Sequence, residues 1–168
     1  SWGGMRVNAW AAKGSDWYYM DSNGTPKGEG WLLYDKNWYY LRQDGKMMHS
    51  EWLWYDNNWY YLQSWGGMYK SQWVTIKGAT YYFRSWGGIY KNGWQEVDGK
   101  TYYFRSWGGM YTGIHTIGGT KYAFQSWGGL YHDQTFTIGG KTYYANSDGT
   151  FATGWVQNGG KTYYFDED

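Results

Sequence analysis

The 168-residue chain has no cysteine and one proline, and leucine, isoleucine and valine are scarce. The absence of cysteine excludes a disulfide framework and thiolate metal sites. With 15 basic and 14 acidic residues, the net charge is +1, so the chain has no basic field suited to a nucleic-acid backbone. No apolar run approaches the roughly 18 residues of a membrane span, so membrane insertion is not expected.

Aromatic residues and glycine are abundant instead. The chain contains 15 Trp, 21 Tyr and 6 Phe. Glycine accounts for 27 of the 168 residues, a fraction more than twice the roughly 7 % of an average protein. Because aliphatic residues are few, we expect buried surfaces made of flat aromatic rings with polar edges.

A repeat of 20 or 21 residues runs through the whole chain. Aromatic pairs mark its period, with a second marker eight residues before each pair and a glycine in the same phase. Three markers in phase indicate a repeat architecture. We therefore predict a single repeat domain over residues 1–168, with about eight repeats. The pairs begin at Tyr18, Tyr39, Tyr60, Tyr81, Tyr102, Tyr143 and Tyr163, and the sixth repeat has Tyr122-Ala123 in their place.

Each repeat has the pattern of a β-hairpin. In the fifth repeat, two β-prone runs, 94–97 and 100–104, flank Asp98 and Gly99. Two-residue hairpin turns need positive φ, which such pairs tolerate. An isolated hairpin is marginally stable, so the hairpins must stack, and we predict an all-β fold, an open β-solenoid of about eight hairpins. The other predicted turn pairs include Lys77-Gly78, Gly118-Gly119, Gly139-Gly140 and Asn158-Gly159.

Strand alternation separates two faces of each hairpin. Trp94 should oppose Tyr103, and their face carries the informative aromatics, whereas Val97, Tyr102 and Phe104 should face the solenoid interior. In repeats one to three, the first face holds two tryptophans and a tyrosine. Such a wall suits a quaternary ammonium group through cation–π attraction, or a sugar ring through stacking. These rings could equally serve only to hold the hairpins together.

The segment 31–40 (WLLYDKNWYY), followed by Leu41 and the link 43–47 with Met47, resembles the choline-binding repeats of Gram-positive surface proteins. Repeats four to eight carry Thr or Lys before the aromatic pair and are similar to glucan-binding and clostridial-toxin repeats. The first resemblance implies a left-handed superhelix with ligands between consecutive hairpins. It also implies a non-catalytic, secreted or cell-surface module that anchors proteins to choline of teichoic acid.

The resemblance assigns ligand-binding positions. Two tryptophans of one hairpin and an aromatic residue of the next would wall each site, and repeats four to eight lack the second tryptophan. We therefore expect choline in repeats one to three and hold a glucan-type saccharide as the alternative ligand. The candidate residues are Trp10, Trp17, Trp31, Trp38, Tyr40, Met47, Trp52, Trp59 and Tyr61.

The tetrapeptide Ser-Trp-Gly-Gly, called the SWGG link below, occurs five times, beginning at residues 1, 64, 85, 106 and 126. It is either an engineered insertion on a scaffold that displays tryptophan, or a link under ligand selection. Since tryptophan rarely adopts positive φ, we predict that the second glycine does so. The link tryptophans would then supply the missing wall, or alternatively cover an open hairpin edge. These candidates are Trp65, Trp86, Trp107 and Trp127, acting with Trp73 and Trp94.

Catalytic chemistry is not expected. His49, His115 and His132 are isolated, and no two carboxylates are predicted to face each other across a cleft as glycoside hydrolysis needs. We predict no enzyme activity, metal or cofactor, and no nucleic-acid partner. A homodimer through the terminal hairpins is a further option. No signal peptide is visible at Ser1 and the chain begins inside a repeat, so we expect a fragment of a secreted or cell-wall protein.

Overall fold

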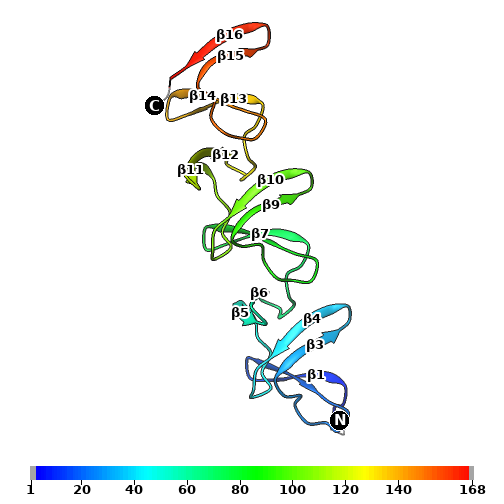
Figure 1. Cartoon of the computed structure of the whole chain (residues 1–168). Coiled ribbons are helices and arrows are strands. Elements are labelled where there is room, and N and C mark those ends of the chain that lie inside the picture. The colour runs from blue at the N-terminus through cyan, green and yellow to red at the C-terminus, as the bar shows by residue number, and fades with distance from the viewer. Residues whose placement is uncertain (1–2, 167–168) are drawn as a thin grey trace. The chain divides into compact units, whose positions relative to one another are not determined.

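A computed structural model describes residues 3–166 (Figure 1). It contains only strands, turns and links, so within these residues no helix is available to cross a membrane. Ser1 and Trp2 of the first SWGG link lie outside the described residues.

Sixteen five-residue strands form eight separate two-stranded antiparallel sheets in the described part of the chain. The predicted all-β array of eight hairpins is confirmed. The hairpins are β1 (Ala9–Lys13) with β2 (Asp16–Met20), β3 (Gly30–Tyr34) with β4 (Asn37–Leu41), β5 (Glu51–Tyr55) with β6 (Asn58–Leu62), β7 (Gln72–Ile76) with β8 (Ala79–Phe83), β9 (Gly93–Val97) with β10 (Lys100–Phe104), β11 (Gly113–Ile117) with β12 (Thr120–Phe124), β13 (Gln134–Ile138) with β14 (Lys141–Ala145), and β15 (Gly154–Asn158) with β16 (Lys161–Phe165).

The chain forms two compact units. The first comprises the described residues up to Val74 together with Tyr82–Ile89, and the second comprises Thr75–Tyr81 together with the described residues from Tyr90. Each unit is considered by itself below. The single domain over 1–168 and the left-handed superhelix stay predictions.

Two-residue turns set the register of the hairpins. Trp94 pairs with Tyr103 and Val97 with Lys100, as predicted. The turn residues Asp98 and Gly99 have φ values of 50° and 71°, as a type I′ hairpin turn requires.

The last hairpin differs from the prediction by one residue. Asn158 pairs with Lys161, so the turn residues are Gly159 and Gly160, with φ values of 58° and 75°. A pair of glycines satisfies both left-handed positions without a Cβ clash, which favours this register over a turn at Asn158-Gly159.

Alternation divides the hairpin of β9 and β10 into a packed and an open face, as predicted, whereas Tyr40 is buried on the predicted open face of β3 and β4. In β9 and β10, Val97, Tyr102 and Phe104 are buried, whereas Trp94 is 38 % exposed. In the first unit, Leu41 is fully buried at the position equivalent to Phe104. The apolar ends of the second strands therefore form the core of each unit.

The links fasten each hairpin to the one before it. In the first unit, the backbone N–H of Met47 donates to the carbonyl of Trp17 (2.8 Å), and that of Met68 donates to Trp38 (2.8 Å). In the second unit, Leu130 donates to Thr101 in the same way (2.8 Å). These bonds hold consecutive hairpins in a fixed stack, as predicted for a repeat whose stability comes from neighbouring units.

The four SWGG links that begin at residues 64, 85, 106 and 126 place positive φ on the first glycine, not the second, whereas Gly3 of the first SWGG link does not have positive φ. Gly66 has φ +93° and its N–H donates to the carbonyl of Gln63 (2.8 Å), as Gly45 does to Arg42 in a link without tryptophan. The prediction that the second glycine takes this conformation is wrong. The turn has a left-handed glycine at the same place in every link between consecutive hairpins, and in the SWGG links among them tryptophan lies one residue before it.

Candidate ligand-binding notches

The first unit contains a solvent-open cavity of about 400 Å³ between consecutive hairpins. Trp10 of β1 and Trp17 of β2 form one side, Tyr39 of β4 forms another, and Met47 and Trp65 come from the two links that follow. Ser15, His49 and Ser64 complete its rim. We call this cavity notch 1.

A second cavity in the same unit, of about 320 Å³, repeats this arrangement. We call it notch 2. Its five main lining residues lie 21 positions after their counterparts, and Lys70 takes the position of His49. Periodicity therefore builds one site twice from the same parts. The main lining residues of notch 2 are Trp31, Trp38, Tyr60, Met68 and Trp86.

The rings of each notch meet at steep angles. In notch 2, the ring centroids of Trp31 and Trp38 are 6.3 Å apart with planes at 89°, and Trp31 meets Tyr60 at 5.1 Å and 65°. In notch 1, Trp10 meets Tyr39 at 4.9 Å and 61°. Edge-to-face packing is the favoured contact of aromatic rings, and it leaves ring faces directed at the space between them. The predicted placement of both tryptophans on one side of the hairpin is confirmed for Trp31 and Trp38.

The link tryptophans Trp65 and Trp86 lie in different notches from those predicted. Trp65 packs against Tyr39, with ring centroids 5.8 Å apart, and Trp86 packs against Tyr60 in the same way. Both therefore join notches that already have two tryptophans. For these two residues, the prediction that a link tryptophan replaces a missing wall is wrong.

The second glycine of the link explains how the indole is held. A Cβ atom built on Gly67 would lie 1.8 Å from Cη2 of Trp65, so the ring rests directly on the glycine backbone. The indole N–H of Trp65 also donates to Oε1 of Gln63 (3.1 Å). In this link, Gly66 therefore provides the positive φ of the turn, and Gly67 provides the surface on which the indole ring of Trp65 packs.

The same contacts recur in the second unit. Trp107 packs against Tyr81 at 5.9 Å, and Trp127 packs against Tyr102 at 6.0 Å. The Nζ atom of Lys100 lies 4.6 Å from the ring centre of Trp127. Link tryptophans in both units thus pack on the first tyrosine of a pair. Their exposure ranges from 44 % to 48 %, so each keeps surface available to a ligand.

Tyr40 and Tyr61 do not line the notches. Tyr40 is buried behind Trp31 at a ring distance of 5.2 Å, and its hydroxyl donates to Oε1 of Glu29 (3.2 Å). Tyr61 contacts Trp52 at 5.1 Å. Each of these tyrosines packs edge-to-face against the tryptophan that it pairs with across its hairpin.

The remaining candidates occupy partial sites. Trp52 and Trp59 form the same perpendicular corner as Trp31 and Trp38, at 6.3 Å and 82°. Trp73 packs on Tyr82 at 5.0 Å. In the second unit, Trp94 packs on Tyr122 at 4.9 Å but has threonine where Trp38 stands in notch 2. Repeats with a single tryptophan therefore present one indole surface and not a corner.

Tyr39, Tyr60, Met68, His49 and Lys70 are notch residues that the sequence did not single out. The 21-residue period could have identified two of them, because Met68 is equivalent to Met47 and Tyr60 is equivalent to Tyr39.

Both notches are lined mainly by aromatic rings, and Lys70 adds a positive charge to notch 2. Burial raises the pKa of Tyr39 and of Tyr60, so both phenols are neutral at neutral pH. Among the described residues, no carboxylate lines either notch. No group of three His, Cys, Asp or Glu residues suited to a metal ion occurs in residues 3–166. A cation here would be held by ring faces and not by an ion pair.

Family models match most of the chain. The putative cell wall binding repeat matches residues 8–25, 29–47, 50–68, 71–89 and 92–110, and the choline-binding repeat matches 135–168. No curated protein sequence matches the chain.

Solved structures give the same relationship. The chain is similar to CbpJ from Streptococcus pneumoniae, at 32 % identity and a TM-score of 0.80 over 94 % of this chain and 56 % of that one. Choline binding protein F from the same organism, in the presence of a peptidoglycan analogue, gives 34 % identity and 0.74 over 90 % and 54 %. The choline-binding domain of CbpL gives 31 % and 0.51 over 94 % and 92 %. The chain thus spans about half the length of the first two relatives.

Proposed function

Because the chain belongs to the choline-binding, cell-wall-binding repeat family, we propose that notches 1 and 2 bind the quaternary ammonium group of choline. The supporting observation is the repeated lining of two tryptophans, a tyrosine and a methionine together with the SWGG tryptophan, with the two hairpin tryptophans of notch 2 perpendicular to each other. The module acts by binding and carries no catalytic step of its own. Choline of teichoic acid at a Gram-positive cell wall is the proposed partner.

Each notch should bind weakly by itself. Three well-placed rings at roughly 1–2 kcal/mol each give about 4 kcal/mol, which corresponds to a Kd of about 1 mM. Retention on a polymer that carries many choline groups would come from simultaneous occupation of several notches. The function therefore depends on having at least two competent sites in one chain.

Titration of the intrinsic tryptophan fluorescence with choline tests this proposal. Trp17→Ala and Trp38→Ala each remove one wall of a notch, and the double variant should lose most of the response. Trp54→Ala is the matched control, because Trp54 of β5 is 47 % exposed and lines neither notch. An unchanged isotherm in the double variant, with the circular dichroism of the wild type, would refute the proposal.

A glucan-type saccharide is the second candidate ligand, for the later repeats. Trp94 is 38 % exposed, packs on Tyr122, and has Thr101 on the same face. A single flat indole beside a hydroxyl suits the C–H face of a sugar ring better than a compact cation. Titration with dextran should then quench fluorescence in the wild type and not in Trp94→Ala. A response to dextran that survives in this variant would exclude Trp94 as the platform.

We also propose a homodimer, which is supported by two exposed aromatic residues of the last hairpin. Trp155 and Tyr164 are 75 % and 60 % exposed on one face, whereas the equivalent Trp94 packs against Tyr122 of the next hairpin and is 38 % exposed. A second copy of the chain could cover this face. Sedimentation should show a monomer–dimer equilibrium that Trp155→Ser shifts to monomer, and a wild-type monomer at high concentration would exclude it.

A further inference from the structure

A polar cavity of about 330 Å³ lies in the second unit, apart from the notch positions described above. It forms around the fifth link, where β10 ends. Its polar lining residues are Arg105, Asn92 and Ser106, and its aromatic lining residues include Tyr103, Trp107 and Tyr111.

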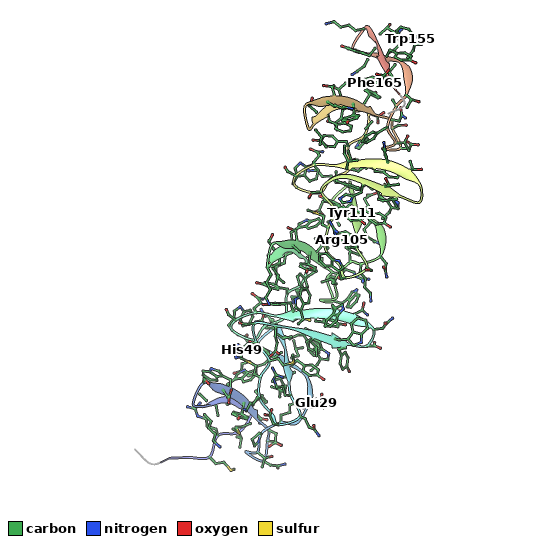
Figure 2. The ribbon with its side chains drawn as sticks, turned by 90° about the vertical axis from the view of Figure 1, so that its left-hand side faces the viewer. Glu29, His49, Arg105, Tyr111, Trp155 and Phe165 are labelled. Carbon is green, nitrogen blue, oxygen red and sulfur yellow. The ribbon has the colours of Figure 1, made fainter. Side chains whose placement is uncertain are left out.

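An aromatic platform holds the Arg105 guanidinium. Its Cζ atom lies 4.6 Å from the ring centre of Tyr111 and 5.6 Å from that of Trp107, and Figure 2 shows Arg105 beside Tyr111. Tyr111 is itself stacked nearly parallel to His115 at 3.8 Å and to Tyr103 at 5.2 Å. Stacking on rings fixes a guanidinium in orientation while its N–H groups, which point outward in the guanidinium plane, stay available.

Arginines at the equivalent place in other links are occupied. Arg42 forms an ion pair with Glu51, and Nη2 of Arg84 donates to the carbonyl of Ile89 (2.7 Å). Arg105 differs from both. Within residues 3–166, its side chain makes no hydrogen bond and no ion pair, so five N–H donors are left without a protein acceptor.

The neighbouring polar side chains are also available. Over the described residues, neither the Asn92 amide nor the Ser106 hydroxyl has a hydrogen-bond partner, and no carboxylate lines the cavity. One positive charge and two further polar side chains therefore line the same solvent-open cavity, which aromatic residues also line. Bidentate binding of a planar or tetrahedral oxyanion is the chemistry for which a fixed guanidinium is suited.

We propose that the cavity around Arg105 is an oxyanion-binding site, which takes a carboxylate or a phosphate group through Arg105, Asn92 and Ser106. The site is independent of choline binding, because none of its residues lines notch 1 or notch 2. A module with both site types would contact cationic and anionic groups of one polymer.

The test is an NMR titration of the ¹⁵N-labelled chain with sodium phosphate and, separately, with sodium acetate, at constant ionic strength maintained by sodium chloride. The Arg105 Nε–Hε and Trp107 indole signals should shift in a saturable way with at least one of these anions. Arg105→Gln should weaken binding by about tenfold or more, and Arg105→Lys should retain only part of it. Arg84→Gln, at a guanidinium already bonded to backbone, is the control and should bind as the wild type does.

The wild type by itself can overturn the proposal. It would do so if the chemical shifts changed linearly with both anions, or changed no more than they do with chloride. Equal binding by Arg105→Gln and the wild type would also overturn it. A saturable response to phosphate only, or to acetate only, identifies which oxyanion the site takes. If the wild type binds phosphate or acetate but does not bind choline, the proposed function is refuted and the anion site is retained.

Discussion

The indole ring of Trp65 rests on the backbone of Gly67, so closely that a Cβ atom there would lie 1.8 Å from Cη2 of the ring. The same relationship joins Trp86 to Gly88 in notch 2. It makes the second glycine of the SWGG link a determinant of the notch, although Gly67 itself does not line the cavity.

Gly67→Ala should therefore displace Trp65 and weaken choline binding in notch 1 by several-fold. Gly67 does not have positive φ, so alanine adds no backbone strain and the fold should persist. Calorimetric titration with choline measures the effect. Gly28→Ala is the matched control, since a Cβ atom at Gly28 would meet nothing within 4 Å. Identical isotherms for the two variants would contradict the role given to Trp65.

Gly66→Ala should affect stability more than Gly67→Ala does. Gly66 has φ +93°, and a Cβ atom there would lie 2.3 Å from Sδ of Met47. Backbone strain and overpacking together should destabilise the first unit by roughly 1–3 kcal/mol. Urea unfolding followed by circular dichroism measures the change. A midpoint equal to that of Gly67→Ala would show that the turn tolerates a side chain.

Lys70→Glu should strengthen choline binding at notch 2. Lys70 lines this notch, and no carboxylate does so among the described residues, so the native site carries a charge that repels a cation. Reversal of an exposed charge should raise affinity by about two- to fivefold at low salt, and the gain should shrink as salt increases. Lys161→Glu makes the same change in β16, outside both notches, and should leave affinity unaltered. A gain of the same size in both variants would assign it to net charge alone.

Asp21 should contribute stability that is lost in acid. Its carboxylate accepts hydrogen bonds from the backbone N–H groups of Thr25 (3.1 Å) and Asn23 (2.8 Å) and from the Thr25 hydroxyl (3.0 Å), and these bonds lower its pKa. A lowered folded-state pKa means that stability is fully present above the unfolded value and is lost as the pH falls through the folded one.

Asp21→Asn tests this pH dependence. The melting temperatures of the wild type and the variant should differ by a constant amount above the unfolded pKa of about 4, and the difference should shrink as the pH falls through the lowered folded-state pKa. Thermal unfolding followed by circular dichroism over this range measures the difference. A constant difference down to the lowest pH would show that the charge of Asp21 is not involved.

The hairpins could be predicted because their information is local. A two-residue turn such as Asp98-Gly99 fixes every cross-strand pair of its hairpin, and alternation then places Trp31 and Trp38 on one face. In the last hairpin, both Asn158-Gly159 and Gly159-Gly160 are suitable turn pairs, and the turn forms at Gly159-Gly160. Local chemistry decides a register only when one candidate turn is clearly preferred.

The composition of the notches depends on the offset between hairpins, which local sequence does not encode. Tyr39 belongs to the packed face of its own hairpin, yet its ring closes the notch of the hairpin before it. Trp65 reaches the same notch from a link that follows the third hairpin. The hydrogen bond from Met47 to Trp17 sets this offset, and no residue pattern shows which carbonyl a link will reach.

A crystal structure of the chain with bound choline is the most direct measurement of the central claim. Our account predicts density for a trimethylammonium group within notch 1 between Trp10, Trp17 and Tyr39, and an equivalent group in notch 2. Choline density confined to other surfaces, with both tryptophan corners unoccupied at saturating ligand, would contradict it.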